Sequence, residues 1–120
     1  MPTPVIILVG GPNTNAKFEF YERFTSCKIT DKVHIHVVKN AIPQIVLINT
    51  PAYHENRDPL DYCWEGIFQI GDIIVNFGDW MPREIYGVKP PFSHLPFFLT
   101  WSGDHDETMT RIMDKVAEMV

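Results

Sequence analysis

The chain has 120 residues, is 45% hydrophobic and carries a formal net charge of -5. This length predicts one compact domain, residues 1–120, with a single core. Because nucleic acids and anionic membranes are bound through concentrated Lys and Arg, the acidic balance without a basic run argues against both as partners. Cys27 and Cys63 lie outside any CxxC pattern, which predicts reduced thiols rather than a disulfide or a metal site.

The first predicted strand is the continuous aliphatic run at residues 5–9, a pattern typical of a strand buried on both faces of a parallel sheet. The run is too short for a signal peptide or a membrane span, so we expect an intracellular, cytoplasmic protein. Residues 16–24 predict a helix, with Phe20, Tyr21 and Phe24 turned inward.

Residues 32–38 alternate strictly between two faces, which predicts a strand. One face carries Val33, Ile35 and Val37, and the other carries His34, His36 and Val38. A second apolar run follows closely at residues 44–48, so the two strands are expected to form an antiparallel hairpin. The histidine pair indicates a half-exposed strand face. No spacing gathers the three or four ligands that Zn²⁺ requires, so no metal site is predicted.

The second half of the chain predicts a helix at 60–69 and strands at 72–77 and 95–100. Between these strands, residues 78–94 are rich in proline and allow only a short helix near 82–86.

A final amphipathic helix begins at Thr108 and is expected to pack on the sheet. Its apolar stripe comprises Met109, Ile112, Met113, Val116 and Met119. The order of elements predicts an α/β three-layer domain with a mostly parallel five-stranded sheet and one antiparallel hairpin strand. A ligand of such a sheet would bind at the carboxyl ends of its strands.

Four segments follow one another in the chain: VIILVGGPNTNAKFEFYERFT, QIVLINTPAY, DIIVNF and LPFFLTWSGD. The first resembles the first strand, the G-x-P-N-x-G-K-[ST] phosphate loop and the first helix of Ras-like small GTPases, particularly the bacterial translation type. The others resemble the third strand ending in D-T-P-G, the fourth strand, and the fifth strand ending in N-K-x-D. The resemblance covers roughly residues 4–104 and implies a truncated Ras-like G domain. The nucleotide contacts that it implies fall on Gly11, Asn13, Lys17, Asn49 and Asp104.

The phosphate loop departs from the motif of this family. Aligned on Lys17, it has Ala16 in place of the last glycine and Phe18 in place of the Ser or Thr that binds Mg²⁺. Aligned instead on the leading Gly-x-Pro-Asn, it is one residue too long, and Ala16 takes the lysine position. Either alignment removes charge neutralisation that phosphoryl transfer needs.

The later motifs depart as well. Asn49 stands for the aspartate of D-T-P-G and Ala52 for its glycine, while Trp101 and Ser102 replace the Asn and Lys of N-K-x-D. The sixth strand and last helix of the family are absent in this alignment. An alternative places LTWSGDHDE on the sixth strand and deletes the middle of the domain, and the sequence leaves both open.

Lys17 and Asp104 each have two interpretations. Lys17 either binds phosphate or, as is more common in the first turn of a surface helix, is solvated. Asp104 either pairs with guanine or caps the last helix in a capping box with Glu107, which we favour.

The aromatic, proline-rich segment at 77–98 supplies candidate partner-binding residues, namely Trp80, Met81, Tyr86 and Phe92. The same side chains could instead cover the sheet.

The sequence therefore predicts a pseudo-GTPase, a catalytically inactive GTPase-like domain that acts as a protein-interaction or assembly subunit. It would have no catalytic residue and no cofactor, and would bind a protein partner or a second copy of itself. The alternative is a nucleotide- or phosphate-binding regulatory module without efficient hydrolysis, which would use GTP or GDP with Mg²⁺. An active enzyme is the third possibility.

Overall fold

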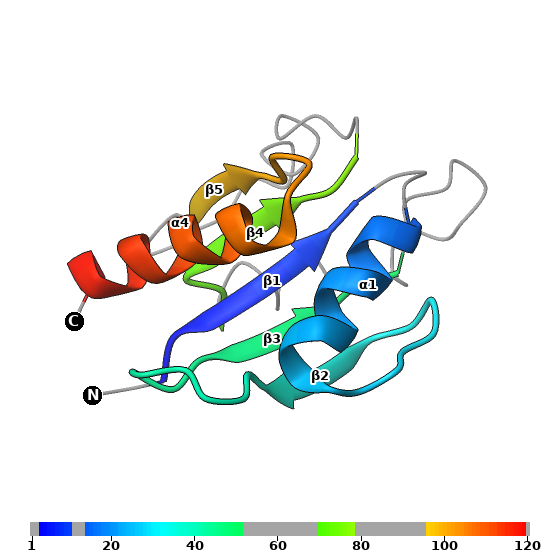
Figure 1. Cartoon of the computed structure of the whole chain (residues 1–120), viewed down its shortest axis with the longest axis horizontal. Coiled ribbons are helices and arrows are strands. Elements are labelled where there is room, and N and C mark those ends of the chain that lie inside the picture. The colour runs from blue at the N-terminus through cyan, green and yellow to red at the C-terminus, as the bar shows by residue number, and fades with distance from the viewer. Residues whose placement is uncertain (1–2, 11–13, 52–69, 79–95, 120) are drawn as a thin grey trace.

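The computed structural model of the chain describes residues 3–10, 14–51, 70–78 and 96–119 (Figure 1). The elements in this part of the chain are β1 (Val5–Val9), α1 (Thr14–Thr25), β2 (His34–Val37), β3 (Val46–Asn49), β4 (Ile73–Asn76), β5 (Phe97–Thr100) and α4 (His105–Met119). Each was predicted from the sequence, with ends that differ by up to three residues. The helices predicted at 60–69 and 82–86 lie outside the described residues.

The strands form one sheet in the order β2-β3-β1-β4-β5. β1 pairs in parallel with β3 and β4, β4 pairs in parallel with β5, and only β2 pairs antiparallel, with β3. This arrangement confirms the predicted mostly parallel sheet and its hairpin. The carboxyl ends of β1, β3, β4 and β5 therefore lie along the same edge of the sheet.

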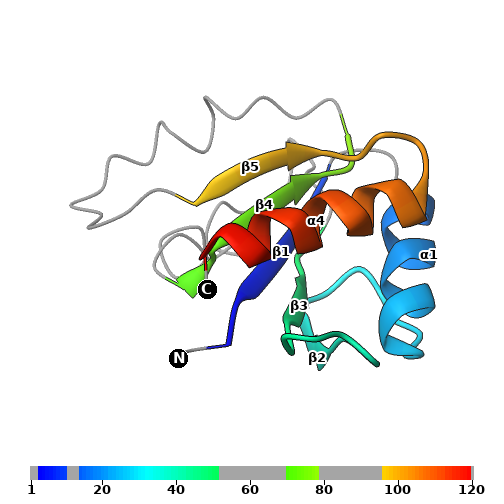
Figure 2. The same ribbon diagram turned by 60° about the vertical axis from the view of Figure 1, so that its left-hand side comes forward.

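Both described helices cover one face of the sheet. Phe20 of α1 and Ile112 of α4 belong to the same apolar cluster as Ile6 and Leu8 of β1. In Figure 1 the two helices lie on the viewer's side of the strands, and Figure 2 shows the same arrangement turned by 60°. The opposite face carries a second cluster, comprising Ile7, Val9, Ile48 and Ile74. A third layer on that face would have to come from residues that the structure does not describe.

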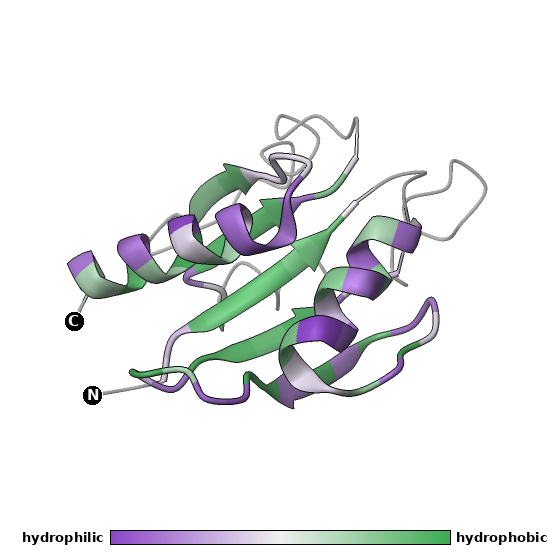
Figure 3. Ribbon diagram, viewed as in Figure 1, coloured by the Kyte–Doolittle hydropathy of each residue, from purple (hydrophilic) through white to green (hydrophobic). Residues whose placement is uncertain are grey.

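The distribution of hydropathy explains this arrangement. In Figure 3, β1 and the strands beside it are hydrophobic along their length, whereas the outward sides of α1 and α4 are hydrophilic. Ile6, Ile7 and Leu8 are fully buried, as predicted for a strand covered on both faces. None of the helices in the described ranges is both long and apolar enough to cross a membrane.

Tyr21 joins α1 to the hairpin. Its buried hydroxyl lies 2.7 Å from His36 Nδ1 and donates to the Leu47 carbonyl oxygen at 3.3 Å. Burial, and to a lesser extent Cys27, raises the pKa of Tyr21 above its ordinary value, so the hydroxyl keeps its proton and remains a donor. This contact turns the histidine face of β2 toward α1.

The faces of β2 differ in exposure in an unusual way. His34 and His36 are half-buried, which confirms the predicted half-exposed face. The apolar side chains on the other face are the more exposed: Val33 is 50% exposed, Ile35 61% and Val37 46%. This edge of the sheet thus presents hydrophobic side chains on the face opposite α1.

The last helix packs on the sheet, as expected, but begins at His105 rather than Thr108. Ile112 and Val116 are fully buried, and Met109 and Met113 pack partly against the same cluster. Met119 was predicted to share this stripe and is instead 40% exposed, because it lies at the end of the helix beyond the buried turn.

Truncation of the buried stripe tests how α4 is held. Ile112→Ala should lower the free energy of unfolding by about 2–5 kcal/mol, because it leaves a cavity in the core. Met119→Ala on the same helix should change it by less than about 0.5 kcal/mol. Urea denaturation measures both, and equal losses would contradict the described packing.

Candidate functional site

The edge formed by the carboxyl ends of the parallel strands collects the residues that the resemblance implicates. Lys17 lies in the first turns of α1, Asn49 is the last residue of β3, and Asp104 follows β5. The structure therefore brings these three segments to one edge, whereas Gly11 and Asn13 lie outside the described residues. The end of β1 also packs closely on β4, because a Cβ on Gly10 would lie 3.1 Å from the Phe77 Cβ.

Lys17 is fully buried, so the interpretation as a solvated surface lysine was wrong. Its Nζ donates a hydrogen bond of 2.6 Å to the Thr50 carbonyl oxygen. Thr50 is itself tied to β1, because its backbone N–H and its Oγ1 both donate to the Leu8 carbonyl oxygen, at 3.2 and 2.9 Å. The buried ammonium thus links the start of α1 to the ends of β3 and β1. A charged donor makes a stronger bond than a neutral one and offsets the cost of burial.

Asn49 holds the segment that precedes β2. It is fully buried, and its Nδ2 donates to the carbonyl oxygens of Lys32 at 2.8 Å and Thr30 at 3.5 Å. Its Oδ1 is buried without a hydrogen-bond partner in the structure as described. An amide fits this position because it is a donor, whereas the aspartate of D-T-P-G would place a carboxylate against two carbonyl oxygens.

Trp101, which stands at the Asn position of N-K-x-D, belongs to an aromatic stack. Its ring lies 5.7 Å from that of Phe77 and 5.7 Å from that of His105, with interplanar angles of 23° and 28°. Phe20 of α1 packs against His105 at 5.8 Å with its ring tilted by 67°. Trp101 therefore packs the end of β5 against α1 and the start of α4. Sequence reasoning identified Trp101 only as a replacement and missed this packing role.

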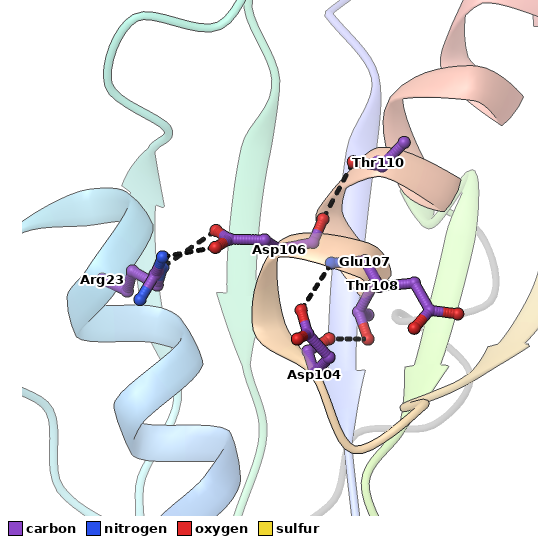
Figure 4. A network of polar contacts seen from close by, with 6 residues as sticks. All are labelled: Arg23, Asp104, Asp106, Glu107, Thr108 and Thr110. Carbon is purple, nitrogen blue, oxygen red and sulfur yellow. Dashed lines mark hydrogen bonds and ion pairs between the residues drawn. The ribbon is translucent and has the colours of Figure 1, made fainter.

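Asp104 caps α4, as favoured from the sequence (Figure 4). Its Oδ1 accepts a hydrogen bond of 2.8 Å from the Glu107 backbone N–H. In a full capping box the Glu107 side chain would accept from the Asp104 backbone N–H. Here that N–H donates to Ser102 Oγ at 3.4 Å, and the Asp104 carbonyl oxygen accepts from Thr108 Oγ1 at 2.8 Å. Gly103 at φ 95° allows the tight turn that leads into this cap.

An ion pair that the sequence did not predict joins the two helices. Arg23 of α1 binds the Asp106 carboxylate through Nη2 at 2.6 Å and Nε at 3.1 Å, as Figure 4 shows. Both side chains are more than half exposed, so the pair contributes at most about 1 kcal/mol. Two residues that are 83 positions apart carry no local signal of their pairing.

No three His, Cys, Asp or Glu side chains of the described ranges converge in a way that could hold a metal ion. Phe18, at the position of the magnesium-binding hydroxyl, is half-buried in α1. The candidate partner residues Trp80, Met81, Tyr86 and Phe92 lie outside the described residues, as does Ala52.

Introducing the aspartate found in D-T-P-G tests the structural role of Asn49. Asn49→Asp should lower the free energy of unfolding by about 1–3 kcal/mol at neutral pH, because the carboxylate cannot donate to the two carbonyl oxygens. The loss should shrink toward pH 4, since the buried carboxyl gains its proton at a higher pH than in the unfolded chain and can then donate. Asn40→Asp, the same change at an exposed position, serves as the control. Urea denaturation that finds Asn49→Asp as stable as wild type would contradict this role.

Comparison with known proteins supports the fold alone. No protein-family model matches the sequence, and no curated protein matches it. Among solved structures, a bacterial selenocysteine-specific elongation factor, EF-Sec, matches 100% of this chain with a TM-score of 0.56 and 10% sequence identity. The chain corresponds to 29% of that protein's length. The described architecture is thus α/β and GTPase-like, which agrees with a truncated G domain.

Proposed function

We propose that this chain is a GTPase-like domain that does not turn over nucleotide and acts as a protein-interaction or assembly subunit. One observation carries the proposal. The described residues at the expected nucleotide contacts, Lys17, Asn49 and Asp104, all make hydrogen bonds within the fold. The bond of Lys17 joins α1 to the end of β3, and that of Asn49 joins β3 to the segment before β2. The bond of Asp104 caps α4.

The side chains of Phe18 and Asn49 support the proposed lack of nucleotide hydrolysis. Phosphoryl transfer depends on Mg²⁺, a hard cation that prefers carboxylate and hydroxyl oxygens. Phe18 supplies no oxygen in its side chain, and the Asn49 amide is neutral and directed through its nitrogen at two carbonyl oxygens. The remaining Asn49 Oδ1 would be a single neutral ligand.

The side chains of Trp101 and Asp104 argue against recognition of a guanine base. Trp101 is stacked between Phe77 and His105, and Asp104 uses a carboxylate oxygen to cap α4. Guanine selection by N-K-x-D requires polar groups that face the base, and an indole has only one N–H donor to offer.

An interaction role is supported by the sheet edge. β2 is the outermost strand of the described sheet, and its face opposite α1 exposes Val33, Ile35 and Val37. Exposed apolar side chains on an edge strand favour association with another chain. The partner residues proposed from the proline-rich segment remain part of this proposal.

A second candidate function is nucleotide or phosphate binding without hydrolysis. The buried ammonium of Lys17 lies near the N-terminus of α1, where helix N–H groups also favour an anion. The ammonium carries three N–H donors and the Thr50 carbonyl oxygen accepts from one, so a phosphate would have to accept from the others. GTP or GDP with Mg²⁺ would then be the ligand.

Thermal unfolding with millimolar GTP, GDP or ATP and Mg²⁺ separates the two functions. We expect no change in Tm and no phosphate release, because the contact residues are engaged in the fold. A ligand at about 100 times its Kd would stabilise the domain by roughly 2.7 kcal/mol, which is several degrees. A shift with one nucleotide would support the second candidate, and phosphate release above the blank would overturn the proposal.

Lys17→Met refines the same experiment, because it keeps the aliphatic stem and removes the ammonium. Without nucleotide it should lower the free energy of unfolding by about 1–3 kcal/mol, since the Thr50 carbonyl loses its buried donor. Lys28→Met at an exposed position is the matched control. If Lys17→Met leaves stability unchanged and abolishes a nucleotide-induced shift, Lys17 binds ligand rather than holding the fold.

A further inference from the structure

Thr30 attaches the segment at 26–33, between α1 and β2, to the two strands of the hairpin. Its backbone N–H donates to His34 Nε2 of β2 at 3.2 Å, and its Oγ1 lies 3.2 Å from the same nitrogen. Its carbonyl oxygen accepts from the Lys32 N–H at 2.8 Å and from Asn49 Nδ2 of β3 at 3.5 Å. The contact with His34 is therefore the tie between this segment and β2.

The direction of the hydrogen bond from Thr30 determines which form of His34 can accept it. A backbone N–H can only donate, so Nε2 must keep its lone pair, and the ring proton of the neutral side chain lies on Nδ1. Protonation at Nε2 would set two N–H donors against each other. The hydrogen bond thus exists only while His34 is neutral.

His36, on the same face of β2, makes a contact of a different kind. Its Nδ1 lies 2.7 Å from the Tyr21 hydroxyl, and its ring stacks on that of His34 with the ring centroids 6.3 Å apart. A hydroxyl can accept as well as donate, so the contact with Tyr21 survives protonation of His36. Because two stacked imidazolium rings repel each other, a charge on His36 adds to the cost of a charge on His34.

The other groups around His34 do not compensate a charge on its ring. Asn49 of β3, which is paired with His34, is neutral, and Lys32 in the adjoining turn carries a charge of the same sign. Asp31 is the carboxylate of that turn and already makes another contact. No ion pair with His34 is found in the part of the chain that the structure describes.

From this geometry we propose that His34 is a pH-sensitive latch, which holds the segment at 26–33 on β2 at neutral pH and releases it at mildly acidic pH. The segment carries Cys27 and Ile29, which pack against the apolar cluster that contains Phe20 of α1. Its release therefore loosens the cover of the core at this end of the domain. The latch is independent of whether the domain binds or hydrolyses a nucleotide.

The sign of the pH dependence follows from the form of His34 that the closed segment binds. The ordinary pKa of a histidine side chain is about 6.5, so the open segment gains a proton below this pH. The closed segment excludes that proton, and the ratio of open to closed segment rises as the pH falls. Between about pH 7.5 and pH 5.5 this ratio should rise about tenfold.

Exchange of the Thr30 amide proton with water measures the latch. The protection factor that NMR gives for this amide, corrected for the intrinsic exchange rate at each pH, should fall about tenfold over the same range. The Val38 N–H, which donates to the Ile45 carbonyl oxygen at 3.0 Å within the hairpin, should keep its protection. This second amide distinguishes release of the segment from general unfolding in acid.

His34→Gln separates the latch from other effects of acid, because its amide oxygen can accept from the Thr30 N–H at every pH. In this variant the protection of Thr30 should be the same at both ends of the range. His36→Gln changes the neighbouring ring on the same strand face, and as the matched control it should retain the fall. Proton–nitrogen correlation NMR of the wild-type histidine rings should place the proton of neutral His34 on Nδ1.

Four results would overturn the proposal. They are a Thr30 protection factor that does not change with pH in the wild type, a fall that persists in His34→Gln, a fall that His36→Gln abolishes, and a neutral His34 with its proton on Nε2. Loss of protection at Val38 equal to that at Thr30 would also count against the latch, because acid would then open the whole hairpin.

Discussion

The hydrogen bond from the buried Lys17 ammonium to the Thr50 carbonyl oxygen is the constraint on which this edge of the domain depends. Thr50 donates two further hydrogen bonds to the Leu8 carbonyl oxygen. Together these bonds hold α1, β3 and β1 at the carboxyl ends of the strands. A buried ammonium is costly unless it is bound, and this geometry supplies an acceptor. Lys17, which the sequence resemblance aligns with the lysine of a phosphate loop, therefore joins elements of the fold.

The other residues that the resemblance aligns with GTPase motifs are also engaged inside the domain. Asn49 donates to two carbonyl oxygens, which an aspartate carboxylate could not do. Trp101 fills the space between Phe77 and His105, and Asp104 ends the turn from β5 by capping α4. The residues at these aligned positions therefore make contacts inside the domain, which is the physical basis for proposing an interaction subunit rather than an enzyme.

The strands, the hairpin and the helix cap could be predicted because each depends on residues close together in the sequence. The run VIILV and the alternation in KVHIHVV were sufficient to place β1 and the hairpin, and the D-x-x-E spacing was sufficient to place the cap. Lys17 was misjudged because its burial depends on Thr50, which is 33 positions away, and helical spacing alone makes such a lysine look solvated. The Arg23 and Asp106 pair was missed for the same reason. The exposure of Ile35 also depends on α1 packing on the histidine face of β2.

Lysine-selective NMR of the Lys17 ammonium, with and without saturating GTP and Mg²⁺, tests whether this ammonium is held by the fold or is available to a nucleotide. Hydrogen bonding in a buried site slows exchange of the ammonium protons with water, so a protected resonance should be observed that Lys17→Met removes. Nucleotide should leave the chemical shift and the exchange rate of this resonance unchanged. A resonance that moves on addition of GTP, or that exchanges as fast as those of exposed lysines, would contradict the claim that Lys17 is committed to the fold.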